Sequence, residues 1–318
     1  MFLDSFRITL LAVAQIFVLG AIGYVLVKKN ILGEDGLDSL SRLVINVIFP
    51  FMIFSQLISN FSFAVYKKWW IFPLTSLIIT IAGFLVGVLF IKFIKGDKHK
   101  LQFLSLVTFQ NSGYLPLAMV AALFPRDKAG PMFIYIFLFL LGFDLIFWSV
   151  GVYMLRTSEK NKFEWKSLFS PPVIANLVSL SIVFLGLNRF IPGIIARPAA
   201  MIGNCTLPLA MFVVGGNLAV IHLRHVDKKA IFYVVLSKLI ILPALGLLLI
   251  ILFKVPELFA FLILMQLTMP PATSLSVVIR HYKQEDLYIS QGIFFGHILS
   301  LITIPLFLSL YFAFTMLK

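Results

Sequence analysis

Charged residues are scarce in this sequence, and their shortage is the first indication of its class. Of the 318 residues, only 12% are charged, whereas 61% are hydrophobic. A soluble domain usually has about 25% charged residues and far fewer apolar ones. A water-soluble core has no room for so many Phe, Leu and Ile side chains, so lipid must be the solvent for most of the chain. The composition therefore predicts an integral membrane protein.

Acidic residues and cysteines are also few. The chain has 13 Asp and Glu against 26 Lys and Arg, which gives a formal net charge of +13. A nucleic-acid-binding protein would gather such charge on a basic face, but here the basic residues fall in short clusters between apolar runs, so we expect no nucleic-acid partner. Cys205 is the only cysteine, which excludes an internal disulfide and a cysteine-based metal cluster. We expect neither a metal site nor a cofactor.

The apolar residues form ten runs. They cover residues 7–27, 38–59, 69–94, 101–124, 131–155, 171–187, 198–220, 229–253, 257–279 and 287–316. Each predicts a transmembrane helix, because an isolated strand cannot satisfy its backbone polar groups in lipid. The first run is followed by Lys28 and Lys29, whereas a signal peptide carries its basic residues ahead of the apolar segment, so we interpret this run as a span. The sequence therefore predicts an all-α membrane protein with ten transmembrane helices.

The distribution of Lys and Arg predicts the orientation of these helices. The loops after odd-numbered runs hold 16 basic residues, and the other side holds 9. The richer set consists of Lys28, Lys29, Arg42, Lys92, Lys95, Lys98, Lys100, Arg156, Lys160, Lys162, Lys166, Arg224, Lys228, Lys229, Arg280 and Lys283. Because basic residues concentrate in cytoplasmic loops, we expect these loops in the cytoplasm and both termini outside the cell.

The two halves of the chain share matching signatures. Asn46 and Asn204 each lie four residues before a proline, at an offset of 158, while Gln110 and Gln266 are 156 residues apart. Gly142 and Gly296 are 154 residues apart. Several matches at nearly one offset indicate an internal repeat. Five runs in each copy make the repeat an inverted one, as in many secondary transporters. We expect a first five-span repeat at 1–155, a cytoplasmic linker at 156–170 and a second, inverted repeat at 171–318.

Prolines occur at paired positions inside the predicted spans. Proline has no N–H, so it leaves the carbonyl four residues earlier without its helical partner. Pro50 leaves the carbonyl of Asn46 without a partner, and Pro208 does the same to that of Asn204. Pro270 leaves the carbonyl of Gln266 without one. Each proline alone is best interpreted as a kink satisfied by neighbouring helices. The pairing between the repeats instead favours a polar site inside the membrane.

Spans 4 and 9 look discontinuous. Residues 110–116 place two amides, a hydroxyl, a glycine and a proline in mid-span, and residues 267–274 are their counterpart. Asn, Ser and Thr favour helix N-caps and Pro favours the first turn, so each stretch predicts the start of a second half-helix. The positive ends of two half-helix dipoles would then bind a carboxylate. The candidate substrate-binding residues are Asn46, Asn111, Ser112, Gly113, Tyr114, Pro116, Asn204, Gln266, Thr268, Pro270 and Pro271.

Three ionisable residues lie inside predicted spans. An intramembrane charge is a functional hypothesis by default, although it also serves as a structural partner. Asp144 is the best candidate for coupling transport to a proton or cation. Lys238 has three interpretations: it snorkels to the interface, pairs with Asp144 or attracts an anion. His297 titrates in a useful range but is more often a packing residue in such a position.

Several motifs together resemble the auxin efflux carrier family, which includes plant PIN-type carriers and bacterial organic-acid permeases. The resemblance covers nearly the whole chain. It includes Gly23-Tyr24 before Lys28-Lys29, Leu40-Ser41-Arg42-Leu43-Val44-Ile45-Asn46-Val47 before Pro50, Asn111-Ser112-Gly113-Tyr114 with Pro116, Phe147-Trp148-Ser149-Val150-Gly151, and Met269-Pro270-Pro271-Ala272-Thr273. As a set these motifs are fairly specific.

The resemblance implies two inverted five-helix repeats, with broken helices 4 and 9 crossing at their prolines. The family's crossover site maps onto residues 111–116 and 268–271 of this chain. The function implied is a plasma-membrane carrier of a small organic anion, such as malate, malonate or an auxin-like acid, working by alternating access. The long cytoplasmic loop of many plant members is absent, which argues against regulation by a phosphorylated loop. A homodimer is compatible with this reading.

Two other classes of function stay open on the sequence alone. A channel or a sensor could use the same scaffold, because nothing in the sequence proves coupled transport. An intramembrane enzyme would need a nucleophile with a base, or a clustered acid or histidine motif. The sequence contains no G-x-S-x-G motif, no H-E-x-x-H motif and no paired aspartates in spans. We therefore do not expect an enzyme.

Overall fold

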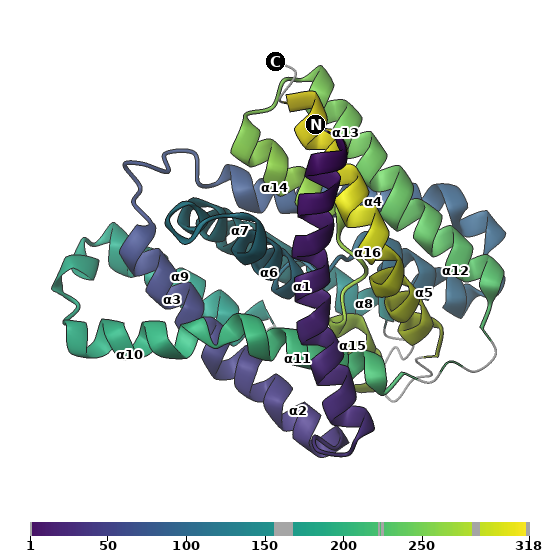
Figure 1. The fold of residues 1–318 in the computed structure, drawn as a ribbon, viewed down its shortest axis with the longest axis horizontal. Coiled ribbons are helices and arrows are strands. Elements are labelled where there is room, and N and C mark those ends of the chain that lie inside the picture. The colour runs from purple at the N-terminus through teal and green to yellow at the C-terminus, as the bar shows by residue number, and fades with distance from the viewer. Residues whose placement is uncertain (1, 156–167, 222, 224–225, 282–286, 316–318) are drawn as a thin grey trace.

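The computed structural model describes residues 2–155, 168–221, 223, 226–281 and 287–315, and this part of the chain is helical (Figure 1). Most of the predicted linker, at 156–167, lies outside the described residues. Seven helical stretches are long and apolar enough to cross a membrane. They are Phe2–Lys28, Glu34–Asn60, Ile71–Phe93, Ala129–Leu155, Gly193–Ala219, Lys228–Leu252 and Leu287–Phe314. Shorter apolar helices accompany them, so the prediction of an all-α membrane protein is confirmed.

The individual helices follow the predicted runs closely. In chain order they are α1 (Phe2–Lys28), α2 (Glu34–Leu43), η1 (Val44–Ile48), α3 (Phe49–Asn60), α4 (Ile71–Phe90), η2 (Ile91–Phe93), α5 (Asp97–Thr108), α6 (Tyr114–Leu123), α7 (Arg126–Ile146), η3 (Phe147–Gly151), α8 (Val152–Leu155), α9 (Pro171–Phe184), η5 (Leu187–Phe190), α10 (Gly193–Asn204), α11 (Thr206–Ala219), α12 (Lys228–Val235), η6 (Leu236–Ile241), α13 (Leu242–Leu252), α14 (Glu257–Thr268), α15 (Ser274–His281) and α16 (Leu287–Thr315). Of the described elements, η1, η3 and η6 are π-helical turns within longer helices, and η2 and η5 are 3₁₀ turns.

Three of the predicted runs are not long continuous helices. The fourth run divides into α5 and α6, and the ninth into α14 and α15. The sixth run forms α9, whose 14 residues make a helix of only about 21 Å at 1.5 Å per residue. That length falls short of a hydrocarbon core of roughly 30 Å. The helices that differ from simple spans therefore include both of the predicted discontinuous ones.

Prolines account for two of the π-helical turns. η1 ends just before Phe49-Pro50, and η6 ends just before Leu242-Pro243. Because proline supplies no N–H and its ring clashes with the carbonyl four residues earlier, the preceding turn widens. The asparagine whose carbonyl Pro50 was predicted to free, Asn46, lies within η1.

Helix α1 lies across α11 and runs antiparallel to α16 (Figure 1). Glycines allow α1 and α11 to approach closely: a Cβ atom added to Gly215 would overlap the backbone of Gly20, and one added to Gly23 would overlap the backbone of Phe212. In the contact of α1 with α16, the hydroxyls of Thr9 and Ser309 lie 2.8 Å apart. The first turns of the chain and its last described turns therefore lie at the same end of the molecule.

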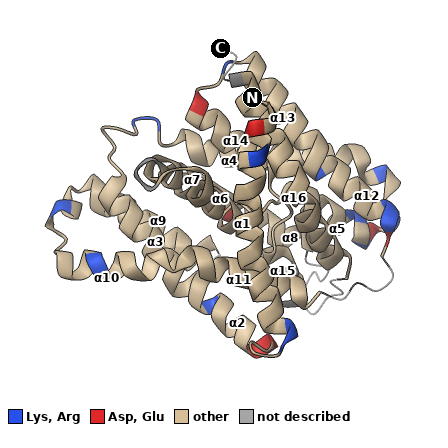
Figure 2. Cartoon of the chain, viewed as in Figure 1, with Lys and Arg blue, Asp and Glu red and all other residues tan. Residues whose placement is uncertain are grey.

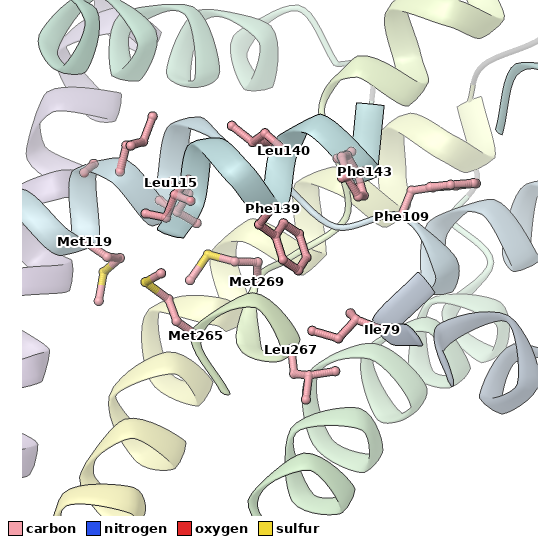
Figure 3. Close-up of a cluster of buried hydrophobic side chains, with 14 of the residues drawn as sticks. Ile79, Phe109, Leu115, Met119, Phe139, Leu140, Phe143, Met265, Leu267 and Met269 are labelled. Carbon is pink, nitrogen blue, oxygen red and sulfur yellow. The ribbon is translucent and has the colours of Figure 1, made fainter. Parts of the chain in front are cut away.

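Most of the described charged residues lie away from the middle of the long helices, with Asp144 and Lys238 as exceptions. Figure 2 shows Lys and Arg at helix ends and in connecting turns around the rim, while the helix bodies are almost free of charge. The interior holds a large apolar cluster around the point where the chain breaks between α5 and α6 and between α14 and α15 (Figure 3). Phe109 and Met269 come from the two breaks, Leu115 from α6, and Phe139 from α7.

Candidate functional site

The two helix interruptions meet inside the molecule. The N–H of Asn111 donates a hydrogen bond to the carbonyl oxygen of Pro270 at 2.8 Å, and the N–H of Ala272 donates to the carbonyl oxygen of Phe109 at 3.0 Å. Gln110 and Pro271 thereby form an isolated antiparallel bridge. Non-helical backbone at membrane depth requires such partners, because the hydrocarbon supplies none. The two interrupted stretches predicted from the sequence are both observed, and they satisfy each other.

Two buried side chains add to this pairing. The Nε2 of Gln266 donates to the carbonyl oxygen of Ser112 at 3.1 Å. The ammonium of Lys238, whose residue is 1% exposed, donates to the carbonyl oxygen of Val107 at 3.0 Å and to Oε1 of Gln110 at 3.3 Å. A buried charge is tolerated only where oxygen atoms replace its water. Lys238 therefore fixes the end of α5 and the side chain of Gln110.

A cavity of about 140 Å³ opens beside the paired breaks. Its walls come from η1 and α3, the first break, α7 and η3, the start of α9, and the second break. The lining residues are Ile45, Phe49, Gln110, Asn111, Ser112, Gly113, Tyr114, Leu140, Phe143, Asp144, Phe147, Trp148, Ser170, Pro172, Ala272, Thr273 and Ser274. We call it the crossing cavity. The first residues of both half-helices, Tyr114 of α6 and Ser274 of α15, belong to its wall.

Three residues that line this cavity have buried hydrogen-bond donors without partners among the described atoms. Nε2 of Gln110 and Nδ2 of Asn111 are buried and have no partner among the described atoms, and the hydroxyl of Ser170 has none either. The Oε1 of Gln110 is already occupied by Lys238, so this amide has only its N–H groups left to offer. Buried polar groups are rarely left unpaired, and each one costs about 1–3 kcal/mol. Unpaired donors on a cavity wall indicate a ligand rich in acceptor atoms.

Asp144 is the one acidic residue among the described residues in the wall of the crossing cavity. It lies on α7, is half-buried, and makes no hydrogen bond or ion pair with the residues that the structure describes. Tyr114 lines the same cavity. A carboxyl group with no protein partner in such a place is free to exchange protons or bind a cation from the cavity.

The remaining predicted site residues divide into two groups. Gln266, Thr268, Pro270 and Pro271 lie behind the wall, where they hold the breaks together. Pro116 is buried in the first turn of α6. Asn46 and Asn204 are instead exposed, and neither lines the crossing cavity, which differs from the prediction that both would.

The position of Asn46 has a simple helical cause. Ile45 and Phe49 are four residues apart and share one helix face, which is the face turned to the cavity. Asn46 follows Ile45 by one residue within the π-helical turn η1 and so lies on another face. Ile45, Phe49 and the aromatic residues of α7 and η3 line the cavity but are not among the residues predicted from the sequence. The spacing of Phe143 and Phe147, again four residues, could have indicated them.

The other two ionisable residues do not line the crossing cavity. Lys238 neither snorkels nor pairs with Asp144, because its ammonium is held inside by Val107 and Gln110. His297 is also buried, and its Nδ1 lies 2.8 Å from the carbonyl oxygen of Ile293 on its own helix. His297 lines a second cavity, between α1, α6, α11 and α16.

Comparison with known proteins decides the family. The profile of a family described as "Membrane transport protein" matches residues 8–164 and 158–308. The chain belongs to the auxin efflux carrier family. It is similar to Protein PIN-LIKES 1 of Arabidopsis thaliana, with 22% identity over 95% of this chain and 78% of that protein. It is also similar to an uncharacterized transporter of Methanothermobacter thermautotrophicus, with 28% identity over 92% of this chain and 95% of that one.

Membership of the auxin efflux carrier family settles the class of the protein. It is a multi-pass membrane transporter and not an enzyme. A member of the auxin efflux carrier family must bind what it carries, and the residues that bind must change partners when the cargo leaves. Among the described residues, the crossing cavity combines two half-helix starts, the carboxyl group of Asp144 and three residues whose buried donors have no partner.

Proposed function

We propose that this protein is a secondary transporter that carries a small organic anion across the plasma membrane by alternating access, and that the anion binds in the crossing cavity. The cargo is a carboxylate such as malate, malonate or an auxin-like acid. The observation that carries the proposal is the pair of buried amide donors without a partner among the described atoms, Nε2 of Gln110 and Nδ2 of Asn111, in the break just before α6.

The chemistry of the wall favours binding of an anion by helix N-termini and not by a fixed positive charge. Helix N-termini present free N–H groups and a positive dipole end, and two such ends, at Tyr114 and Ser274, lie in the wall. Among the described lining residues there is no Lys or Arg side chain, and Lys238 is already engaged. A volume of about 140 Å³ equals that of about five water molecules, which suits a small acid. Binding by dipoles alone also allows the cargo to leave.

The same cavity favours coupling to a proton or cation through Asp144. An ionised carboxyl in the wall would repel a carboxylate at close range, by several kcal/mol in a medium of low dielectric constant. The anion therefore binds when Asp144 carries a proton or has a cation beside it. The ion gradient is coupled to cargo in this way because the anion binds only together with a proton or cation in the cavity.

We propose ten spans in two inverted five-helix repeats, at 1–155 and 171–318, with both termini outside the cell. Several observations support this arrangement. The two ends of the chain lie together, which requires an even number of spans. The two breaks pair in antiparallel fashion. The hydroxyl of Thr206 donates to the carbonyl oxygen of Ile48 at 3.3 Å, and these residues are 158 apart, like Asn46 and Asn204.

Uptake of labelled mono- and dicarboxylates into proteoliposomes tests the proposed function. We expect at least one of them to accumulate, and Asn111→Ala to weaken its binding by about ten- to a hundredfold, because one hydrogen bond to a charged group contributes roughly 1.5–3 kcal/mol. Asn204→Ala is the matched control, since Asn204 is exposed outside the cavity and should bind normally. Equal affinity of wild type and Asn111→Ala would show that the anion binds elsewhere.

A further inference from the structure

A second cavity, of about 220 Å³, lies between α1, α6, α11 and α16, and it shares no lining residue with the crossing cavity. Its interior wall includes Leu115 and Met211, which are buried. Of its described lining residues, only Tyr24 and His297 have polar side chains. An apolar cavity of about 150 Å³ is large enough to bind benzene. This one therefore has room for an aromatic ring with a small substituent.

The position of its mouth indicates the phase from which a ligand enters. Ala21, Tyr24 and Ile298 line the cavity and are also exposed on the outer surface of α1 and α16. Both helices are among the long apolar ones, so these side chains face acyl chains in a membrane. Entry from the bilayer favours a neutral, lipid-soluble molecule.

His297 determines which polar group such a molecule needs. Its ring is 1% exposed, and its Nδ1 lies 2.8 Å from the carbonyl oxygen of Ile293. A carbonyl oxygen can only accept, so Nδ1 carries the proton and donates it. In the neutral imidazole the other nitrogen, Nε2, is then an acceptor. Nε2 is buried and has no partner among the described atoms. The unmet requirement in this apolar space is a single hydrogen-bond donor.

We propose that this second cavity is a binding site for a neutral, lipid-soluble molecule of about the size of a phenol, whose hydroxyl donates to Nε2 of His297. The apolar body replaces the contacts that an empty apolar cavity forfeits. The hydroxyl satisfies the buried Nε2 of His297, whose ring belongs to a residue that lines the cavity. The site lies on the other side of the start of α6 from the crossing cavity, because Leu115 lines one and Tyr114 the other. It is thus separate from the proposed anion site.

Fluorine NMR of para-fluorophenol with the full chain in lipid nanodiscs tests the proposal, with para-fluoroanisole as the matched probe that lacks the donor. We expect saturable binding of the phenol, and binding of the anisole about tenfold weaker, because a methyl group replaces the donating hydrogen. His297→Leu should reduce the preference for the phenol to nearly none.

A second pair of variants covers the case in which His297→Leu fails to fold. Ala21→Trp places a ring in the mouth of the cavity, and we expect it to abolish saturable binding. Ile22→Trp adds the same ring to an exposed neighbour that does not line the cavity, and it should bind the phenol as wild type does. Equal affinity for both probes, or unchanged binding in Ala21→Trp, would overturn the proposal.

Discussion

At the scale of single residues, Lys238 shows how a buried charge serves structure. The carbonyl oxygen it binds belongs to Val107, in the last turn of α5, where carbonyls have no helical partner and the helix dipole is negative. Its second bond holds Gln110 with its N–H groups free. Lys238 therefore positions residues of the crossing, and we propose that it acts on cargo through Gln110.

Lys238→Met should destabilise the protein. The change leaves the oxygens of Val107 and Gln110 buried without a donor, at a cost of about 1–3 kcal/mol for each. We expect a lower melting temperature in detergent, together with weaker cargo binding. Lys228→Met, at an exposed lysine at the start of α12, is the control. If Lys238→Met melts like wild type yet loses cargo binding, the ammonium contacts the anion directly.

Asp144→Asn should separate transport from its driving gradient. An amide keeps the shape of the side chain but can neither take up a proton nor attract a cation. We expect gradient-driven uptake to disappear while counterflow exchange of cargo continues, measured in the same proteoliposomes. Asp97→Asn removes an exposed carboxylate that pairs with Lys100 at 2.8 Å, and it should leave both activities unchanged. Uphill accumulation by Asp144→Asn would mean that Asp144 is structural.

At the scale of elements, the sequence predicted where helices break but not which face of each helix lines the crossing cavity. Asn, Ser, Gly and Pro in mid-span are sufficient to end one half-helix and begin another, so residues 110–116 and 267–274 could be recognised. Which side of a helix meets a cavity depends on packing between distant elements. Lipid and protein interior are both apolar, so hydrophobicity does not distinguish the two sides of such a helix. The sequence therefore predicts Asn46 in the wall of the crossing cavity, whereas Ile45 and Phe49 line it.

The contact of α1 with α11 should be sensitive to a single methyl group. In Gly215→Ala the new Cβ would overlap the backbone of Gly20, so the helices must move apart and lose contacts along their length. Overpacking of this kind costs about 1–3 kcal/mol. Gly33→Ala is the control, because a Cβ there meets nothing within 4 Å. Thermal unfolding in detergent should show a lower melting temperature for Gly215→Ala alone; equal melting would mean that α1 and α11 adjust freely.

At the scale of the whole molecule, two observations bear on the orientation, which stays a prediction. Lysines and arginines lie at helix ends around the rim (Figure 2), and the two ends of the chain lie together. The basic residues of the loops predict the orientation from the sequence alone, because they can be counted without knowing how the helices pack. The inverted repeat stays a prediction, since few residues carry it.

Cysteine labelling should reveal the orientation in the membrane. In a Cys205→Ser background the chain has no other cysteine, so Lys67→Cys and Lys95→Cys introduce single exposed thiols in loops of opposite predicted side. We expect a membrane-impermeant maleimide added to intact cells to label the cysteine at 67 and not the one at 95. Labelling of the latter from outside, or of a cysteine placed in the 156–170 linker, would reverse the topology.

The link between the two breaks also has a consequence for how new carriers evolve. It is made by main-chain N–H and carbonyl groups of residues 109, 111, 270 and 272. Every amino acid except proline can supply such an N–H, so a substitution at Asn111 can change what the cavity selects while the link survives. At these positions the side chains, which would contact the cargo, can therefore change while the backbone groups that link the two breaks stay the same. A lineage can exchange one cargo for another by point mutation without passing through an unfolded ancestor.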